Sequence, residues 1–251
     1  MKCYFDGSIG GDDDRWLTLG GFVATDAAWK DFHHNWHLML RERYPIAPYL
    51  HMTDLLTGNE PFERRAGWKD CKVTQLINDA LTVLHQVPKN ELCAFACSID
   101  TIAWRKLIAE GHPINPPAVL AAEIGIGNLF AWYRQHHGMA MAHLFYDTNE
   151  PFIRSIRTRW RQYNDPGKVT DQLFWGTIAT IQPIEMRATP PMQAADMIAW
   201  ATTRRLRNHP NDQWSHLADT LIGTRHHPGI LTATQLDPIT ETIMRAKHPK
   251  P

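Results

Sequence analysis

The chain has few cysteines and no long apolar run, and each shortage excludes a class of protein. Its 251 residues include four cysteines, which are too few and too scattered for the disulfide framework of a secreted domain. Cys93 and Cys97 share one face of an expected strand and lack zinc-ribbon spacing, so we expect them in the core. No apolar run reaches the roughly 18 residues of a membrane span, and the start lacks a signal-peptide core. The composition therefore predicts a cytoplasmic protein that does not enter a membrane.

An excess of charge of either sign is also missing. Twenty-six Lys and Arg residues balance twenty-six Asp and Glu residues. This balance argues against a protein that recognises a DNA sequence through a broad basic surface. It is compatible with an enzyme that needs only a local basic strip. The 43% of hydrophobic residues is enough for one large globular domain.

Strand and helix patterns alternate along the chain, which predicts an α/β protein. The expected strands are 2–6, 16–25, 92–99, 141–147 and 176–187. The expected helices are 27–43, 69–86, 118–136, 150–163 and 192–207. Residues 208–251 are polar and rich in His and Pro, so we expect an extension made of loops and one short helix.

The segment Tyr4-Phe5-Asp6-Gly7-Ser8 ends an apolar strand on a carboxylate. A carboxylate at the mouth of a buried strand is costly unless a cation holds it, and a hard metal ion is one such cation. Asp-Gly also forms ordinary hairpin turns, so the segment alone leaves both interpretations open.

Three further carboxylates stand alone among apolar residues. Asp147 ends the strand 141–147, Glu123 interrupts an apolar helix, and Asp196 lies in the apolar stretch 192–200. Each one singly could cap a turn, pair with an arginine or reach solvent. Burying a bare carboxylate costs several kcal/mol, so the four together indicate a shared cation site.

The order of these elements resembles the RNase H-like fold, in which strand 1 ends in Asp-Gly-Ser. The chain more specifically resembles the RNase H-like family called domain of unknown function 3800, over roughly residues 2–207. The pieces that carry this resemblance are Phe5-Asp6-Gly7-Ser8, Leu19-Gly20-Gly21-Phe22-Val23, Leu50-His51-Met52, Tyr146-Asp147 and Met192-Gln193-Ala194-Ala195-Asp196-Met197-Ile198-Ala199-Trp200.

The resemblance implies an RNase H-like domain at 1–207 with a helical insertion at about 26–90, followed by the extension 208–251. We expect a mixed five-stranded sheet with strand 1 between strands 2 and 4, and with helices on both faces. The resemblance also implies that Asp6, Glu123, Asp147 and Asp196 form an acidic cluster. The family commonly has Asp-Glu-Ser-Gly where this chain has Asp6-Gly7-Ser8-Ile9, so a second acid beside Asp6 is missing.

Four carboxylates suit Mg²⁺ or Mn²⁺, because these ions prefer oxygen ligands and require neither Cys nor His. Two such ions about 4 Å apart can stabilise the attacking and the leaving oxygen of a phosphodiester at once. The expected function is therefore metal-dependent nuclease activity, with Asp6, Glu123, Asp147 and Asp196 as metal ligands and catalytic residues.

Other residues near this expected site suggest how it would bind nucleic acid. Arg154, Arg157 and Arg161 share one face of the helix after Asp147, and could follow a phosphate backbone or form a solvated face. We also expect Ser8 to contact nucleic acid. His51 is a candidate catalytic residue that would deliver a proton, or alternatively a buried histidine bonded to the backbone.

Two other classes of function stay open. The first is an RNase H-like module without catalytic activity that binds nucleic acid or a protein. The second is an actin-like ATPase, although the chain shows neither the repeat nor the second Gly-rich loop of that class. His33 and His37 have the i, i+4 spacing of a zinc-binding pair, but no Glu follows His33 as a metalloprotease requires.

Overall fold

The computed structural model describes residues 1–10, 15–42, 45–138, 140–150, 153–163, 175–207 and 214, together with the backbone of 226–231. The strands are β1 (Lys2–Gly10), β2 (Trp16–Ala24), β3 (Leu92–Asp100), β4 (Ala142–Asp147), β5 (Ile178–Ile184) and β6 (His226–Leu231). The α-helices are α1 (Asp26–Arg41), α2 (Met52–Thr57), α3 (Asp70–Gln86), α4 (Thr101–Ala109), α5 (Pro117–His137), α6 (Ile153–Tyr163) and α7 (Pro190–Arg207). Short 3-10 turns are η1 (Arg64–Ala66), η2 (Trp175–Thr177) and η3 (Met186–Ala188). None of the helices in this part of the chain is long and apolar enough to cross a membrane.

The strands form one mixed sheet in the order β5-β4-β1-β2-β3-β6. β1 pairs antiparallel with β2 and parallel with β4, so the expected place of strand 1 between strands 2 and 4 is confirmed. β6 pairs parallel with β3 and adds a sixth strand that we did not expect. Its segment contains Pro228 and Gly229, which weaken a strand pattern, and the sequence therefore predicts loops and one short helix for this region.

β1 is longer than expected, and this changes the place of Asp6. The strand continues to Gly10 as a ladder with β2, so the expectation that Asp6 ends the strand is wrong. The parallel pairing with β4 nevertheless stops at Phe5 and Tyr146. Asp6 therefore lies where β1 leaves β4 and continues only as part of the hairpin.

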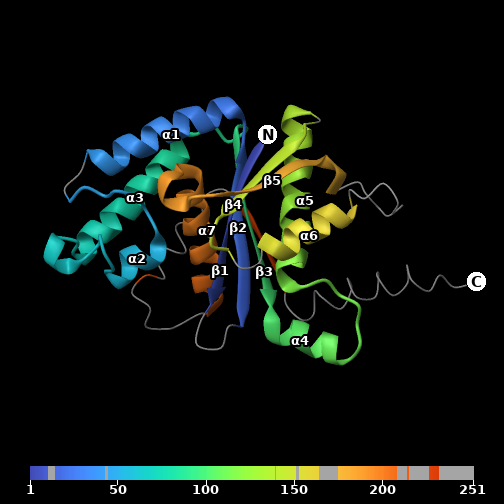
Figure 1. Cartoon of the computed structure of the whole chain (residues 1–251). Helices are drawn as coiled ribbons and strands as arrows, with labels where there is room; N and C mark the ends of the chain where they lie inside the picture. Colours follow the sequence, from blue (N-terminus) through green and yellow to red (C-terminus); the bar gives the residue numbers. More distant parts are fainter. Residues whose placement is uncertain are drawn as a thin grey trace, which may run out of the picture.

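Helices cover both faces of the sheet, as expected, and enclose a separate apolar core on each face. Figure 1 shows α1, α2, α3 and α7 on one side and α5 and α6 on the other. Side chains of α1, α3 and α7 share the first core with residues such as Tyr4 and Phe22 of the sheet. Side chains of α5 and α6 share the second core with Phe5 and Leu144.

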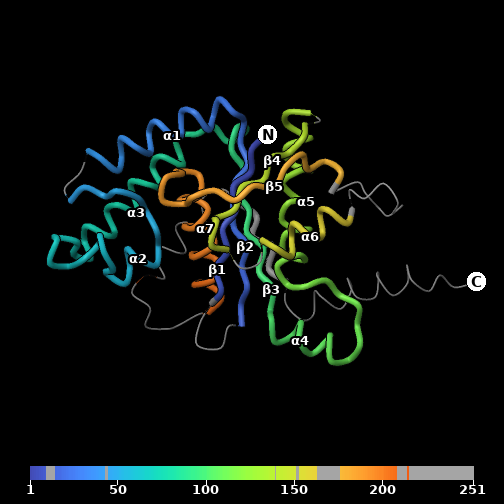
Figure 2. Tube along the Cα trace, viewed as in Figure 1, coloured from blue at the N-terminus to red at the C-terminus, as the bar shows by residue number. Residues whose placement is uncertain are grey.

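The region 26–90 contributes to the main core of the protein. The Cα trace in Figure 2 follows this segment from α1 to α3 on the α7 side of the sheet. Its large side chains Trp36, Phe62 and Trp68 are fully or almost fully buried in the core that contains α7. The region 26–90 therefore packs as part of the same core as α7.

Candidate functional site

Asp6 and Asp147 come from neighbouring parallel strands and face the same side of the sheet. Tyr4 is paired with Phe145 in the ladder, and their rings stack with centroids 4.8 Å apart in the core that contains α7. Because side chains alternate along a strand, Asp6 and Asp147, two residues further on, share that face. The negative charge of Asp147 contributes to a raised pKa of Asp6.

Asp196 reaches the same point from α7, which packs over β1 and β2. Its carboxyl group is buried and accepts a hydrogen bond from the backbone N–H of Met52 at 2.6 Å. It also accepts a hydrogen bond from the side chain of Asp6. Asp196 therefore links α7 both to the start of α2 and to Asp6 of β1.

Glu150 is a fourth acid of this cluster, and the sequence did not reveal it. It lies in the turn after β4, where its Oε1 accepts a hydrogen bond from the backbone N–H of Gly7 at 3.3 Å. Its carboxyl group also hydrogen-bonds the side chain of Asp6. We refer to Asp6, Asp147, Glu150 and Asp196 as the carboxyl cluster.

Burial and mutual repulsion raise the pKa of three cluster acids. Burial is the main cause for Asp6, followed by the charge of Asp196. Burial likewise raises the pKa of Asp196, with a further contribution from Glu150, although the Met52 N–H opposes it. For Glu150, burial and the charge of Asp6 raise the pKa to about 9. The cluster therefore retains protons near neutral pH, as crowded carboxyl groups do.

Glu123 has surroundings that differ from those we expected. It extends from α5, which covers the opposite face of the sheet from α7. Its carboxylate accepts a hydrogen bond from Asn115 at 2.8 Å and lies 3.5 Å from Nε of Arg159. An arginine of α6 thus compensates the charge of Glu123, and Glu150 supplies the fourth acid beside Asp6.

His51 lies in an extended segment that α7 holds from two positions. Gln193 and Asp196 are one turn apart, and they accept hydrogen bonds from the backbone N–H groups of Leu50 and Met52 at 2.9 and 2.6 Å. Nδ1 of His51 lies 2.9 Å from Oδ2 of Asp54. The two sequence pieces 50–52 and 192–200 therefore form a single structural unit.

The residues expected to contact nucleic acid lie on two different faces of the sheet. Ser8 is half-buried in β1 and lies two residues after Asp6, on the same face of the strand. Arg154 and Arg161 are exposed on α6, and Arg157 is half-buried there. α6 packs against α5, so these arginines belong to the face opposite to α7.

The carboxyl cluster offers the oxygen ligands that a hard cation prefers. All four members are carboxyl groups, which Mg²⁺ and Mn²⁺ prefer, and a cation would relieve the repulsion that contributes to the raised pKa values of Asp6, Glu150 and Asp196. In the described part of the chain, no three His, Cys, Asp or Glu side chains surround a common point as the ligands of a formed metal centre do. The acids instead hydrogen-bond one another and nearby backbone N–H groups.

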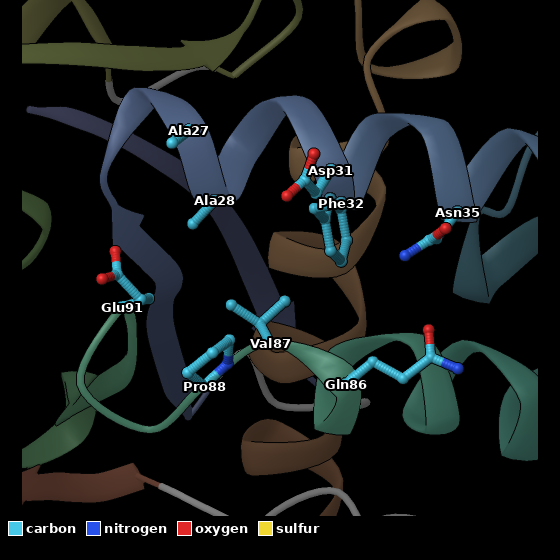
Figure 3. Close-up of a pocket in the computed structure, with 9 residues that line it drawn as sticks. All are labelled: Ala27, Ala28, Asp31, Phe32, Asn35, Gln86, Val87, Pro88 and Glu91. Atoms are coloured by element: carbon cyan, nitrogen blue, oxygen red, sulfur yellow. The ribbon is translucent and has the colours of Figure 1, made fainter.

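A hollow of about 310 Å³ lies elsewhere, between α1 and the end of α3. Figure 3 shows its lining, which includes Asp31 and Asn35 of α1 together with Val87, Pro88 and Glu91 of the loop before β3. No residue of the carboxyl cluster lines it.

Comparisons of the chain with protein-family models, curated proteins and solved structures gave no match.

Proposed function

We propose that the protein is a metal-dependent nuclease of the RNase H-like type, which hydrolyses phosphodiester bonds with Mg²⁺ or Mn²⁺. The observation that carries this proposal is the convergence of Asp6, Asp147, Glu150 and Asp196 at the end of the β1–β4 ladder. Four carboxyl groups this close together repel one another when ionised, unless they share cations. Two divalent ions held by them would stabilise the charges on the attacking and leaving oxygens.

The topology supports this proposal in a second way. A hairpin of β1 and β2 continues into antiparallel β3, β4 then pairs parallel with β1, and a late helix, α7, brings an acid to Asp6. This order is the one on which the resemblance to RNase H-like proteins was based. The resemblance and the acid cluster point to the same reaction class and have Asp6, Asp147 and Asp196 in common, while Glu150 belongs to the cluster alone.

Under this proposal, the acids of the carboxyl cluster are the metal ligands, and neighbouring backbone groups orient them. Asp6, Asp147, Glu150 and Asp196 would hold the cations through their carboxylate oxygens. Hydrogen bonds from the Met52 and Gly7 N–H groups to Asp196 and Glu150 would orient two of these ligands.

The remaining expected residues would act on the nucleic acid itself. The arginines of α6 would follow the phosphate backbone of a strand, and Ser8 would lie next to it. His51 directly precedes Met52, whose backbone N–H donates to Asp196, and under this proposal its imidazole would exchange a proton with the leaving or attacking group.

The experiment is a cleavage panel with single-stranded, duplex and RNA–DNA hybrid substrates, in Mg²⁺, Mn²⁺ or EDTA. Wild type should cleave at least one substrate with a metal and none in EDTA. Asp147→Asn should lose this cleavage while keeping its thermal unfolding temperature, because Asp147 is only half-buried at the strand end. Cleavage by Asp147→Asn at the wild-type rate would refute the nuclease, whereas binding of nucleic acid without any cleavage would identify the non-catalytic module.

A further inference from the structure

Arg187 is an exposed cation held in one place by two contacts. It lies in η3, directly after β5, and its guanidinium carbon is 4.8 Å from the centroid of the Tyr49 ring. Its Nη2 lies 3.5 Å from Oδ2 of Asp54. The Arg187 side chain is nevertheless 58% exposed. An arginine in such surroundings loses little further freedom when it binds a ligand.

Asp54 is the group that fixes this arrangement. It is buried, and its carboxylate also accepts a hydrogen bond from the Tyr49 hydroxyl at 3.0 Å. Burial would raise the pKa of Asp54, but hydrogen bonds from His51, Tyr49 and Asn59 keep the pKa below its usual value. Asp54 therefore stays ionised and attracts the guanidinium.

Two hydrogen bonds link the turn that carries Arg187 to Asp147 and to α7. The N–H of Met186, the preceding residue, donates to Oδ1 of Asp147 at 3.2 Å. The side-chain amide of Gln193 donates to the carbonyl oxygen of Arg187 at 2.9 Å. Arg187 thus directly follows a residue, Met186, that is hydrogen-bonded to Asp147.

We propose that Arg187 is a phosphate-binding residue for the nucleic-acid strand that the carboxyl cluster would act on. This inference rests on the proposed function and adds a second basic contact, on the α7 face, to the α6 arginines on the other face. A strand that approaches clustered carboxylates needs cations at their rim, since phosphate and carboxylate repel each other. The guanidinium has five N–H donors in a planar fork that matches phosphate oxygens, and the contact with Asp54 engages Nη2.

The test is binding of a labelled single-stranded oligonucleotide, as DNA and as RNA, in Ca²⁺ at several salt concentrations. Arg187→Gln should weaken binding by about tenfold and lower the salt slope by about one, as expected for the loss of one phosphate contact. Arg187→Lys should recover part of the affinity, because it keeps the charge without the fork. Lys106→Gln is the matched control, because it also removes one positive charge, from an exposed position on α4 that is away from the cluster.

Metal binding separates this inference from the proposed function. Arg187→Gln should bind Mn²⁺ in calorimetry as wild type does, because it alters no carboxyl group. Wild-type affinity for the oligonucleotide in Arg187→Gln, with metal binding intact, would overturn the inference alone. Equal losses of affinity in Arg187→Gln and Arg187→Lys, with a lower unfolding temperature, would show that the arginine only supports Asp54. Wild type that binds neither Mn²⁺ nor either oligonucleotide would remove the proposed function as well.

Discussion

Asp6 and Gly20 lie opposite each other in the β1–β2 ladder, where the backbone of α7 packs directly against Gly20. A Cβ atom added at Gly20 would lie 2.6 Å from the backbone nitrogen of Ala199 and 2.8 Å from its Cα. Asp196 is three residues before Ala199 on the same helix. The missing side chain at position 20 therefore lets α7 approach closely enough for Asp196 to hydrogen-bond Asp6.

Gly20→Ala should destabilise the protein by about 1–3 kcal/mol, because the added methyl group meets helix backbone and forces α7 away from the sheet. Gly20→Val should cost more. Urea unfolding measures both changes. Gly176→Ala is the control, since a Cβ at Gly176 has nothing within 4 Å. Equal stability of Gly20→Ala and the control would mean that α7 can shift freely and that its close packing does not position Asp196.

The sequence predicted the elements of this site better than their contacts. Asp147 was placed at a strand end because the apolar alternation before it is regular. The apolar run before Asp6 likewise predicts a strand end at Asp6, yet β1 continues through it to Gly10.

The sequence fails to predict the contacts of residues whose neighbours come from strands or helices far away along the chain. Glu150 follows Asp147 in a polar turn and resembles a solvated helix start. Only the parallel register of β1 and β4 brings that turn to Gly7. Glu123 was chosen because it interrupts an apolar helix, but its partner Arg159 lies on a different helix, which no local pattern reveals.

Asp6→Asn should stabilise the metal-free protein, and increasingly so as the pH rises from 5 to 9. The pKa of Asp6 is raised by burial and then by the charge of Asp196. The folded protein keeps a proton that the unfolded chain has already lost, so stability falls as the pH rises towards the raised pKa. Asparagine carries no such charge.

Thermal unfolding in EDTA buffers measures this effect. We expect the unfolding temperature to rise by about 2–4 °C for each kcal/mol of repulsion relieved. Asp31→Asn, which removes an exposed carboxylate of α1, should follow the wild-type pH profile. If Asp6→Asn followed that profile too, charge crowding at Asp6 would not affect stability.

Glu150 and Glu123 can be distinguished by metal binding. Glu150→Gln should weaken Mn²⁺ binding by at least tenfold in calorimetry, because it removes a proposed ligand that hydrogen-bonds Asp6. Glu123→Gln should retain wild-type affinity, because its carboxylate is engaged with Asn115 and Arg159. Mn²⁺ should also raise the unfolding temperature of Glu123→Gln and raise that of Glu150→Gln less. Weaker Mn²⁺ binding by Glu123→Gln, with wild-type binding by Glu150→Gln, would show that Glu123 and not Glu150 is a metal ligand.

Gln193 joins the parts of the protein that surround the cluster. It is 1% exposed, and its Oε1 accepts hydrogen bonds from Leu50 N–H and from Nε1 of Trp36 at 2.9 and 2.8 Å. Its amide nitrogen donates to the carbonyl oxygen of Arg187 at 2.9 Å. One side chain therefore orients both the segment before α2 and the turn after β5.

Gln193→Leu should destabilise the protein by several kcal/mol, because each buried polar group left without a partner costs about 1–3 kcal/mol. Gln193→Glu should be milder at pH 5.5 than at pH 8. A protonated glutamic acid can still accept from Leu50 and donate to Arg187, whereas burial disfavours the ionised form. Urea unfolding at both pH values measures this difference, with exposed Gln86→Leu as the control. Gln193→Leu as stable as that control would mean that these hydrogen bonds follow the packing of α7 and do not hold the site together.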